Sequence, residues 1–238
     1  KSITTFTKPK KPYAAEWTYT GETDPSHWGE LSPKYMLAKD GKQQSPIDLV
    51  DPEDEEPPQL ELNYKPSKID LVYNGHTIEE TGEAGSTLRV DGKSFTLKQF
   101  HFYAPSEHTI DGKHAAMEMH LVHLDEAGRI AVVGVMIEEG AGNHALDPVW
   151  DYLPTEVNKK VEFGATVDAS ELLPEKLGYF YYMGALTTPP CSQEVNWYVL
   201  AEPIELSAKQ IEKFTAIINH NNRPVQPLNG RMIVRSAR

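Results

Sequence analysis

Residues 87–103 decide the fold, and they read TLRVDGKSFTLKQFHFY. The segments 87–90 and 94–103 alternate polar residues with aliphatic, β-branched or aromatic ones, which is the period-2 pattern of a strand with one buried face. Between them stands Asp91-Gly92, a dipeptide typical of a tight hairpin turn. The stretch therefore predicts two antiparallel strands joined by a short turn.

Similar segments recur on both sides of this hairpin. Further strands are predicted at 69–73, 115–124, 130–137 and 195–200, and the first of these runs into the turn Asn74-Gly75. Helical periodicity is confined to 146–152, 169–172 and 207–219, where Ser207 is the expected N-cap of the last helix. The acidic, proline-rich stretch 51–58 is interpreted as a solvated loop. The fold class is thus mainly β with peripheral helices.

The composition indicates one globular unit with an acidic surface. Hydrophobic residues make up 39% and charged residues 24% of the chain, and we expect a flexible leader at 1–15 before a single domain at 16–238. A net charge of -12 argues against nucleic acid as a partner. The sequence predicts no membrane span, because no apolar run approaches about 18 residues. The single cysteine, Cys191, excludes an intrachain disulfide.

Two of the predicted strands carry histidines in a matching phase. Alternation places Gln99, His101 and Tyr103 on one face of their strand, and Glu118, His120 and Val122 on one face of theirs. Neighbouring strands would then direct His101 and His120 to a common point. Gln99 and Glu118 are spaced to bond the second ring nitrogen of each histidine, as in metal sites. Spacing alone leaves both a metal site and two ordinary buried or surface histidines open.

Seven segments, in order, strengthen the metal interpretation. They are QSPID (44–48), NGH (74–76), QFHF (99–102), PSEHT (105–109), EMHLVH (118–123), LTTPPC (186–191) and NRPVQPL (222–228). From about Trp17 to the C-terminus the chain resembles the alpha-class carbonic anhydrases, and most of all their bacterial members. The resemblance implies a large, twisted, mostly antiparallel central sheet. It also predicts cis peptide bonds at Ser45-Pro46 and Pro189-Pro190.

The resemblance implies an activity, a cofactor and a set of site residues. The family hydrates carbon dioxide reversibly to bicarbonate on a zinc ion held by three histidines, which correspond here to His101, residue 103 and His120. Thr187 and Glu107 would orient the zinc-bound hydroxide, and His76 would shuttle protons to solvent. Matching positions give Tyr19 and Asn74 for the water network. The substrate pocket would comprise Val122, Val132, Leu186, Thr188, Val195 and Trp197.

The chain departs from this family at the metal site itself, because residue 103 is tyrosine. A phenol must lose its proton, with an ordinary pKa near 10, before it coordinates, and zinc sites in proteins use mainly nitrogen, sulfur and carboxylate ligands. We therefore expect Zn²⁺ to be weakly bound or absent and the protein to be catalytically deficient. Two alternatives stay open: a low-activity zinc hydratase with a rearranged metal site, and an acatalytic binding or storage protein on the same fold.

A second departure concerns Cys191. Bacterial relatives often have a cysteine that pairs with it, but the corresponding position here is Ala38. The resemblance further implies a periplasmic or secreted location and a homodimer.

Overall fold

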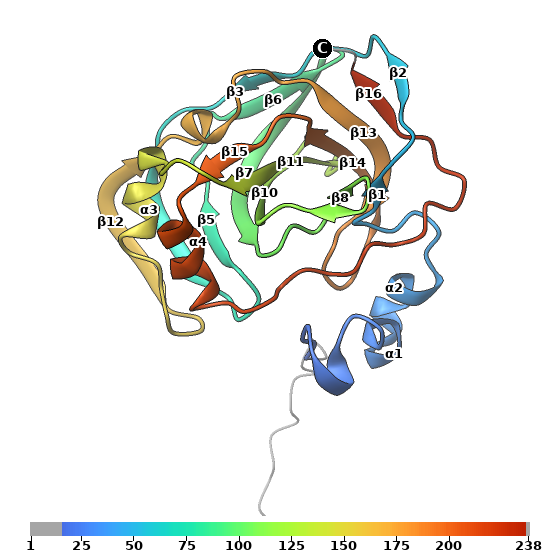
Figure 1. The fold of residues 1–238 in the computed structure, drawn as a ribbon, viewed down its shortest axis with the longest axis horizontal. Coiled ribbons are helices and arrows are strands. Elements are labelled where there is room, and N and C mark those ends of the chain that lie inside the picture. The colour runs from blue at the N-terminus through green and yellow to red at the C-terminus, as the bar shows by residue number, and fades with distance from the viewer. Residues whose placement is uncertain (1–15, 237–238) are drawn as a thin grey trace, which may run out of the picture.

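The computed structural model describes residues 16–236, so the predicted leader at 1–15 lies outside the described residues. Figure 1 shows a large curved sheet at the centre, with α1 and α2 on one side of the molecule and α3 and α4 beside β12 on the other. The α-helices span Trp28–Leu31 (α1), Leu37–Asp40 (α2), Asp147–Trp150 (α3) and Ala208–Thr215 (α4). Short 3₁₀ turns occupy Gly21–Thr23, Pro33–Tyr35, His144–Leu146 and Ala169–Leu172.

The central sheet has 13 strands, and most pairs of adjacent strands in it are antiparallel. Its main path is β12-β4-β5-β7-β10-β11-β14-β13-β16-β2, with parallel pairing only for β11 with β14 and β15, and for β16 with β2. In chain order these strands are β2 (Glu53–Glu55), β3 (Glu61–Asn63), β4 (Ser67–Tyr73), β5 (Ile78–Thr81), β6 (Thr87–Val90), β7 (Lys93–Tyr103), β10 (Met117–Leu124), β11 (Ile130–Glu139), β12 (Lys160–Val167), β13 (Tyr179–Ala185), β14 (Gln193–Leu200), β15 (Ile204–Leu206) and β16 (Val234–Ser236). A small second sheet joins β1 (Asp48–Leu49), β8 (Thr109–Ile110) and β9 (Lys113–His114).

The predicted hairpin is present. β6 and β7 pair from Val90↔Lys93 to Thr87↔Thr96, and the turn residues Asp91 and Gly92 have φ of 49° and 71°. Such left-handed backbone is what a two-residue turn between antiparallel strands requires. The cis bonds predicted at Ser45-Pro46 and Pro189-Pro190 are also present, together with one at Ala104-Pro105 that was not predicted.

Several boundaries differ from the prediction. The helix expected at 207–219 ends at Thr215, although Ser207 caps it as predicted, in a capping box with Gln210. The segment 169–172 forms a 3₁₀ turn rather than an α-helix. Within the stretch interpreted as a loop, Glu53–Glu55 forms the exposed edge strand β2, because the backbone of β16 offers it a parallel partner. Strands β12 and β13 were not predicted.

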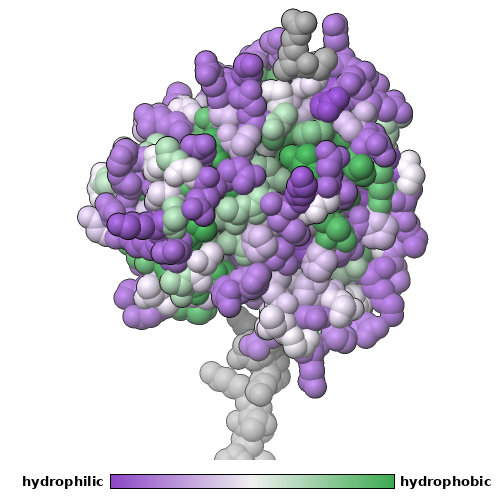
Figure 2. All heavy atoms as spheres, viewed as in Figure 1, coloured by the Kyte–Doolittle hydropathy of each residue, from purple (hydrophilic) through white to green (hydrophobic). Residues whose placement is uncertain are grey.

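Two hydrophobic clusters lie on opposite faces of the sheet. The larger contains Phe100, Phe102 and Met119, whose side chains alternate with those of His101 and His120. The smaller contains Val132, Val195 and Trp197. The surface in Figure 2 is largely hydrophilic, with apolar side chains in small groups. None of the helices in residues 16–236 has the length and apolar character that a membrane crossing requires.

One carboxyl group is buried within the sheet where β4 and β5 separate. Glu80 is 0% exposed, and both of its oxygens accept the Asp70 N–H, at 3.0 and 3.2 Å. Nearby, Glu83 accepts the Lys68 N–H at 3.2 Å. These side chains replace backbone partners beyond the last ladder pair, Leu71↔Glu80. Burial raises the pKa of Glu80 to about 8, and the charges of Asp70 and Glu83 add to the effect.

Glu80→Gln should therefore stabilise the protein in alkali and have little effect in acid. Because the folded state keeps the proton up to a higher pH than the unfolded state, the parent loses stability as pH rises from about 4.5 to about 8. We expect the glutamine variant to gain on the order of 2 kcal/mol above pH 8 and almost nothing at pH 4.5. Urea unfolding across this pH range measures the difference, and a gain that is independent of pH would contradict the assignment.

Candidate active site

The histidines of β7 and β10 face each other on the sheet. His101 and His120 are directly paired residues of the two strands, and their ring centroids lie 5.5 Å apart. Tyr103, two residues further along β7, shares the face of His101, and its ring centroid is 4.7 Å from that of His120. The three side chains are buried. Strand alternation predicted this convergence, and the structure brings all three together.

Each histidine is held by a hydrogen bond from behind. Nδ1 of His101 lies 2.6 Å from Oε1 of Gln99, and since an amide oxygen only accepts, Nδ1 carries the hydrogen. The lone pair of Nε2 then faces the Tyr103 hydroxyl, which donates to it at 3.1 Å. Nε2 of His120 is hydrogen-bonded to Oε2 of Glu118, so its Nδ1 points toward the site.

Tyr103 is 2% exposed, and burial raises its pKa well above the ordinary phenol value, with the charge of Glu107 adding to the shift. The nearby Thr187 side chain opposes this shift. Burial also lowers the pKa of His101 and of His120. At neutral pH the three side chains are therefore neutral, with Tyr103 hydrogen-bonded to His101 and the His120 ring packed against both.

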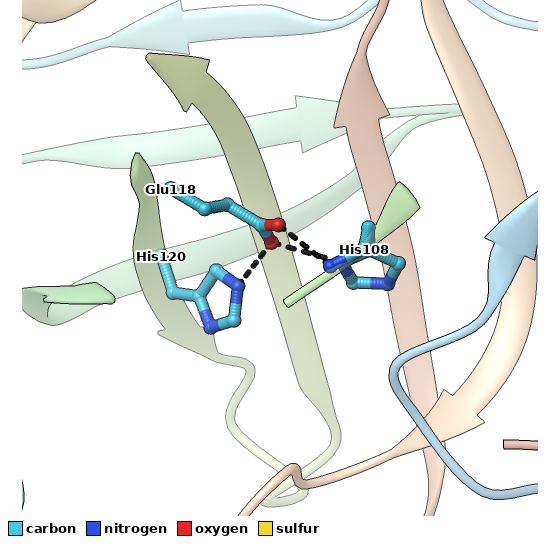
Figure 3. Close-up of side chains that lie close together, drawn as sticks. All are labelled: His108, Glu118 and His120. Carbon is cyan, nitrogen blue, oxygen red and sulfur yellow. Dashed lines mark hydrogen bonds and ion pairs between the residues drawn. The ribbon is translucent and has the colours of Figure 1, made fainter. Parts of the chain in front are cut away.

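Glu118 is the centre of a buried polar network (Figure 3). It accepts the backbone N–H groups of Glu107 and His108, at 3.1 and 2.8 Å, together with Nδ1 of His108 at 2.8 Å and Nε2 of His120. Although burial opposes ionisation, His108 and His120 hold the pKa of Glu118 below its usual value. The carboxylate thus stays charged in the core.

The group His108, Glu118 and His120 has ligand atoms within 4.8 Å of one another, which is close enough to be considered as a metal site. In this structure, however, those atoms bond to each other. The second nitrogen of His108 lies 2.6 Å from the Tyr182 hydroxyl, and that hydroxyl donates its hydrogen to Ser45 Oγ at 2.7 Å. Both ring nitrogens of His108 are thereby engaged. The group is a hydrogen-bond network that supports His120, and sequence reasoning missed the part played by Tyr182 and Ser45.

Glu107 and Thr187 lie beside this network. Oε2 of Glu107 accepts the Arg223 N–H at 2.8 Å, while Oε1 faces Nδ1 of His120 at 3.9 Å. Among the described residues no donor reaches this Oε1 with hydrogen-bond geometry. Burial raises the pKa of Glu107, and the nearby Thr187 side chain opposes the shift. Thr187 is therefore a near neighbour of both Tyr103 and Glu107.

The remaining predicted residues are distributed around the site. The structure brings the expected apolar wall together in the smaller hydrophobic cluster, which includes Val122, Val132, Leu186, Val195 and Trp197. Thr188 is partly exposed, and its carbonyl accepts the Cys191 N–H at 2.8 Å. His123 faces away from the site and bonds Tyr64 and the carbonyl of Ala131 at 2.7 and 3.1 Å.

The turn that carries His76 is held by ring stacking and by hydrogen bonds. The His76 ring stacks on Trp17, with centroids 3.5 Å apart and planes 8° apart, and burial lowers the pKa of His76. The side-chain oxygen of Asn74 accepts the N–H groups of His76 and Thr77, both at 2.9 Å, so its role in the structure is to shape the turn. The Tyr19 hydroxyl is buried without a partner among the described residues.

Comparison with known proteins identifies relatives over nearly the whole length. A family model described as "Eukaryotic-type carbonic anhydrase" matches residues 23–237. A carbonic anhydrase of Pectobacterium carotovorum is 42% identical over 222 residues, which is 93% of this chain and 91% of that protein.

Solved structures agree in fold. An alpha-carbonic anhydrase from Thermovibrio ammonificans, in complex with the inhibitor sulfanilamide, superposes with a TM-score of 0.91 at 46% identity and covers 93% of this chain and 99% of that one. Dioscorin complexed with ascorbate superposes with a TM-score of 0.87 at 27% identity, over 92% of this chain and 97% of that one.

Proposed function

The chain belongs to the alpha-class carbonic anhydrases, whose reaction is the reversible hydration of carbon dioxide, and we propose that it is a catalytically deficient member of that family. One observation carries the proposal: the Tyr103 ring packs against those of His101 and His120, at the position where the family resemblance expects the second zinc-binding histidine. The deficiency would reside in the metal site, because Gln99 and Glu118 still hold the two histidines by hydrogen bonds.

The residues present do not fit a site of three histidines. His101 and His120 offer two ring nitrogens, but the hydrogen of the Tyr103 hydroxyl is directed at Nε2 of His101, the nitrogen that would face a metal. A buried phenol is also a poor source of a phenolate ligand. When bound, zinc supplies an acidified water molecule, and two imidazoles alone hold it too weakly for that chemistry. We therefore assign no catalytic step to a metal in this chain.

The surrounding residues keep an arrangement suited to the family reaction. Gln99 and Glu118 orient the two histidines, and the apolar wall that includes Val132 and Trp197 lies beside them. Thr187 is near enough to Glu107 to oppose the rise of its pKa, and the turn that carries His76 is fixed by Asn74. This favours loss of a single ligand over general decay of the active site.

The parent protein should bind zinc far below one ion per chain after excess zinc is removed. Structural zinc sites with complete ligand sets contribute about 10 to 16 kcal/mol, and the loss of one ligand removes several of these. Hydration of carbon dioxide should be at least about 100-fold slower than in an ordinary family member, since it depends on the metal. Elemental analysis and stopped-flow hydration assays on the same preparation measure both quantities.

The outcomes separate the proposal from its rivals. One zinc ion per chain with substantial turnover would mean a hydratase with a rearranged metal site, and the proposed deficiency would be wrong. A second candidate function, a binding protein, is favoured by the likeness to dioscorin complexed with ascorbate. Calorimetric titration of the parent with ascorbate tests it, and no heat of binding would remove that support.

A further inference from the structure

The backbone next to Tyr103 pairs with β10 on one edge of its strand but has no strand partner on the β5 edge. β7 pairs with β10 through Tyr103↔Glu118, but its ladder with β5 stops earlier, at Glu79↔His101. The peptide groups of residues 102–104 therefore need other hydrogen-bond partners on the β5 side, because buried backbone groups are costly when unpaired.

Two side chains supply those partners. The Thr77 hydroxyl donates to the Phe102 carbonyl at 2.6 Å and accepts the Phe102 N–H at 3.2 Å. The Asn221 side-chain oxygen accepts the Ala104 N–H at 2.9 Å, and its nitrogen donates to the Phe102 carbonyl at 2.9 Å. Asn221 thus bonds the peptide groups before and after Tyr103, as a neighbouring strand would.

The same amide reaches a second part of the site. Nδ2 of Asn221 has two hydrogens, and the one not used by Phe102 is donated to the His76 carbonyl at 3.0 Å. Asn221 is 1% exposed, and it comes from the irregular segment that follows α4. One buried side chain therefore joins the turn of His76 to the end of β7 that carries Tyr103.

We infer that Asn221 is a positioning residue that fixes residue 103 and the His76 turn relative to each other. Three hydrogen bonds come from one rigid amide, two of them buried and the one to the His76 carbonyl partly buried. Together they leave little freedom for either segment to move alone. Thr77 adds a direct link between the same two segments, since it belongs to the turn and bonds Phe102. The value of this coupling for catalysis rests on the roles proposed above for His76 and residue 103, but the coupling itself does not depend on zinc or on activity.

Amide hydrogen exchange followed by NMR tests the inference on the parent chain without metal. Asn221→Leu removes all three bonds, so the Ala104 amide should exchange about tenfold faster or more. If the segments are coupled, the His76 and Thr77 amides, which bond Asn74, should also exchange at least about threefold faster. The Val133 amide in the central strand β11 serves as the reference for global unfolding.

A second variant and a matched control complete the design. Asn221→Asp keeps an acceptor for the Ala104 N–H but loses both donated bonds, so only the two turn amides should exchange faster. Asn222→Leu changes the neighbouring asparagine, whose side chain donates to the Ser106 carbonyl at 3.4 Å, and should change neither set. If the turn amides stay unchanged in both Asn221 variants while Asn221→Leu releases Ala104, then Asn221 is only a structural anchor and the inference is wrong. The experiment measures neither metal content nor hydration rates. The inference about Asn221 is therefore tested independently of the proposed deficiency.

Discussion

Tyr103→His should bind about one zinc ion per chain and hydrate carbon dioxide at least about 100-fold faster than the parent. Position 103 lies on the face of β7 that His101 occupies, and its ring already contacts the His120 ring. A histidine there needs no backbone shift to direct a ring nitrogen to the point where the two other histidines converge. It also removes the hydroxyl that donates to Nε2 of His101. The gain in zinc affinity should be about a thousandfold or more, roughly 4 kcal/mol.

Two further substitutions distinguish ligand gain from relief of blocking. Tyr103→Phe keeps the ring but loses the hydroxyl, and Tyr103→Ala opens space without supplying a ligand, so neither should approach the histidine variant. Stopped-flow hydration and elemental analysis are needed on all four proteins. If Tyr103→His binds one zinc ion yet stays as slow as the parent, the defect lies elsewhere, for example in Thr187 and Glu107. If Tyr103→Phe gains as much as Tyr103→His, the hydroxyl rather than the missing imidazole is the cause.

Local pattern was sufficient to predict the centre of the site but not its surroundings. The period of two residues in a strand places His101 with Gln99 and His120 with Glu118, and all four are arranged that way. The same period separates these residues from Phe100 and Phe102, which belong to the larger hydrophobic cluster. Such short-range regularities depend only on neighbouring residues in the sequence, so they can be predicted without knowledge of the rest of the fold.

Residues that join distant segments leave no comparable signal. Asn221 bonds groups more than 100 positions away, and Tyr182 meets His108 from another strand. A lone asparagine or tyrosine has no spacing that marks it as a partner, because its role depends on which segments the fold brings together. The strands β12 and β13 were missed for a related reason, since the pairing of β12 with β4 and of β13 with β14 and β16 defines them. The replacement of a strand partner by Thr77 and Asn221 likewise becomes visible only once the β5 ladder is known to stop.

Glu118→Gln should lower the free energy of unfolding by about 3 kcal/mol at pH 7, although it only replaces a carboxylate by an amide of the same shape. The carboxylate accepts two backbone N–H groups on Oε1, and Oε2 lies against ring nitrogens of His108 and His120. An amide keeps one acceptor oxygen but turns an NH₂ group toward those two nitrogens, so at least one histidine must change tautomer or lose its bond. Hydrogen bonds to buried charged groups are worth about 1.5 to 3 kcal/mol each, and breaking a buried charge network costs about 3 to 5.

The pH dependence separates loss of charge from loss of shape. Because the folded-state pKa of Glu118 lies below the unfolded value of 4.5, its contribution is present above about pH 4.5 and is lost as pH falls below it. The gap between parent and Glu118→Gln should therefore be widest near neutrality and narrow in acid. Urea unfolding at several pH values measures this gap, with Glu139→Gln as control, since Glu139 is an exposed glutamate on the adjacent strand β11 and should change stability by less than about 0.5 kcal/mol. Equal stability of parent and Glu118→Gln at pH 7 would mean that the four bonds of this carboxylate do not hold His120 in place. In that case His120 would be held in place by the packing of its ring against Tyr103 and Trp197.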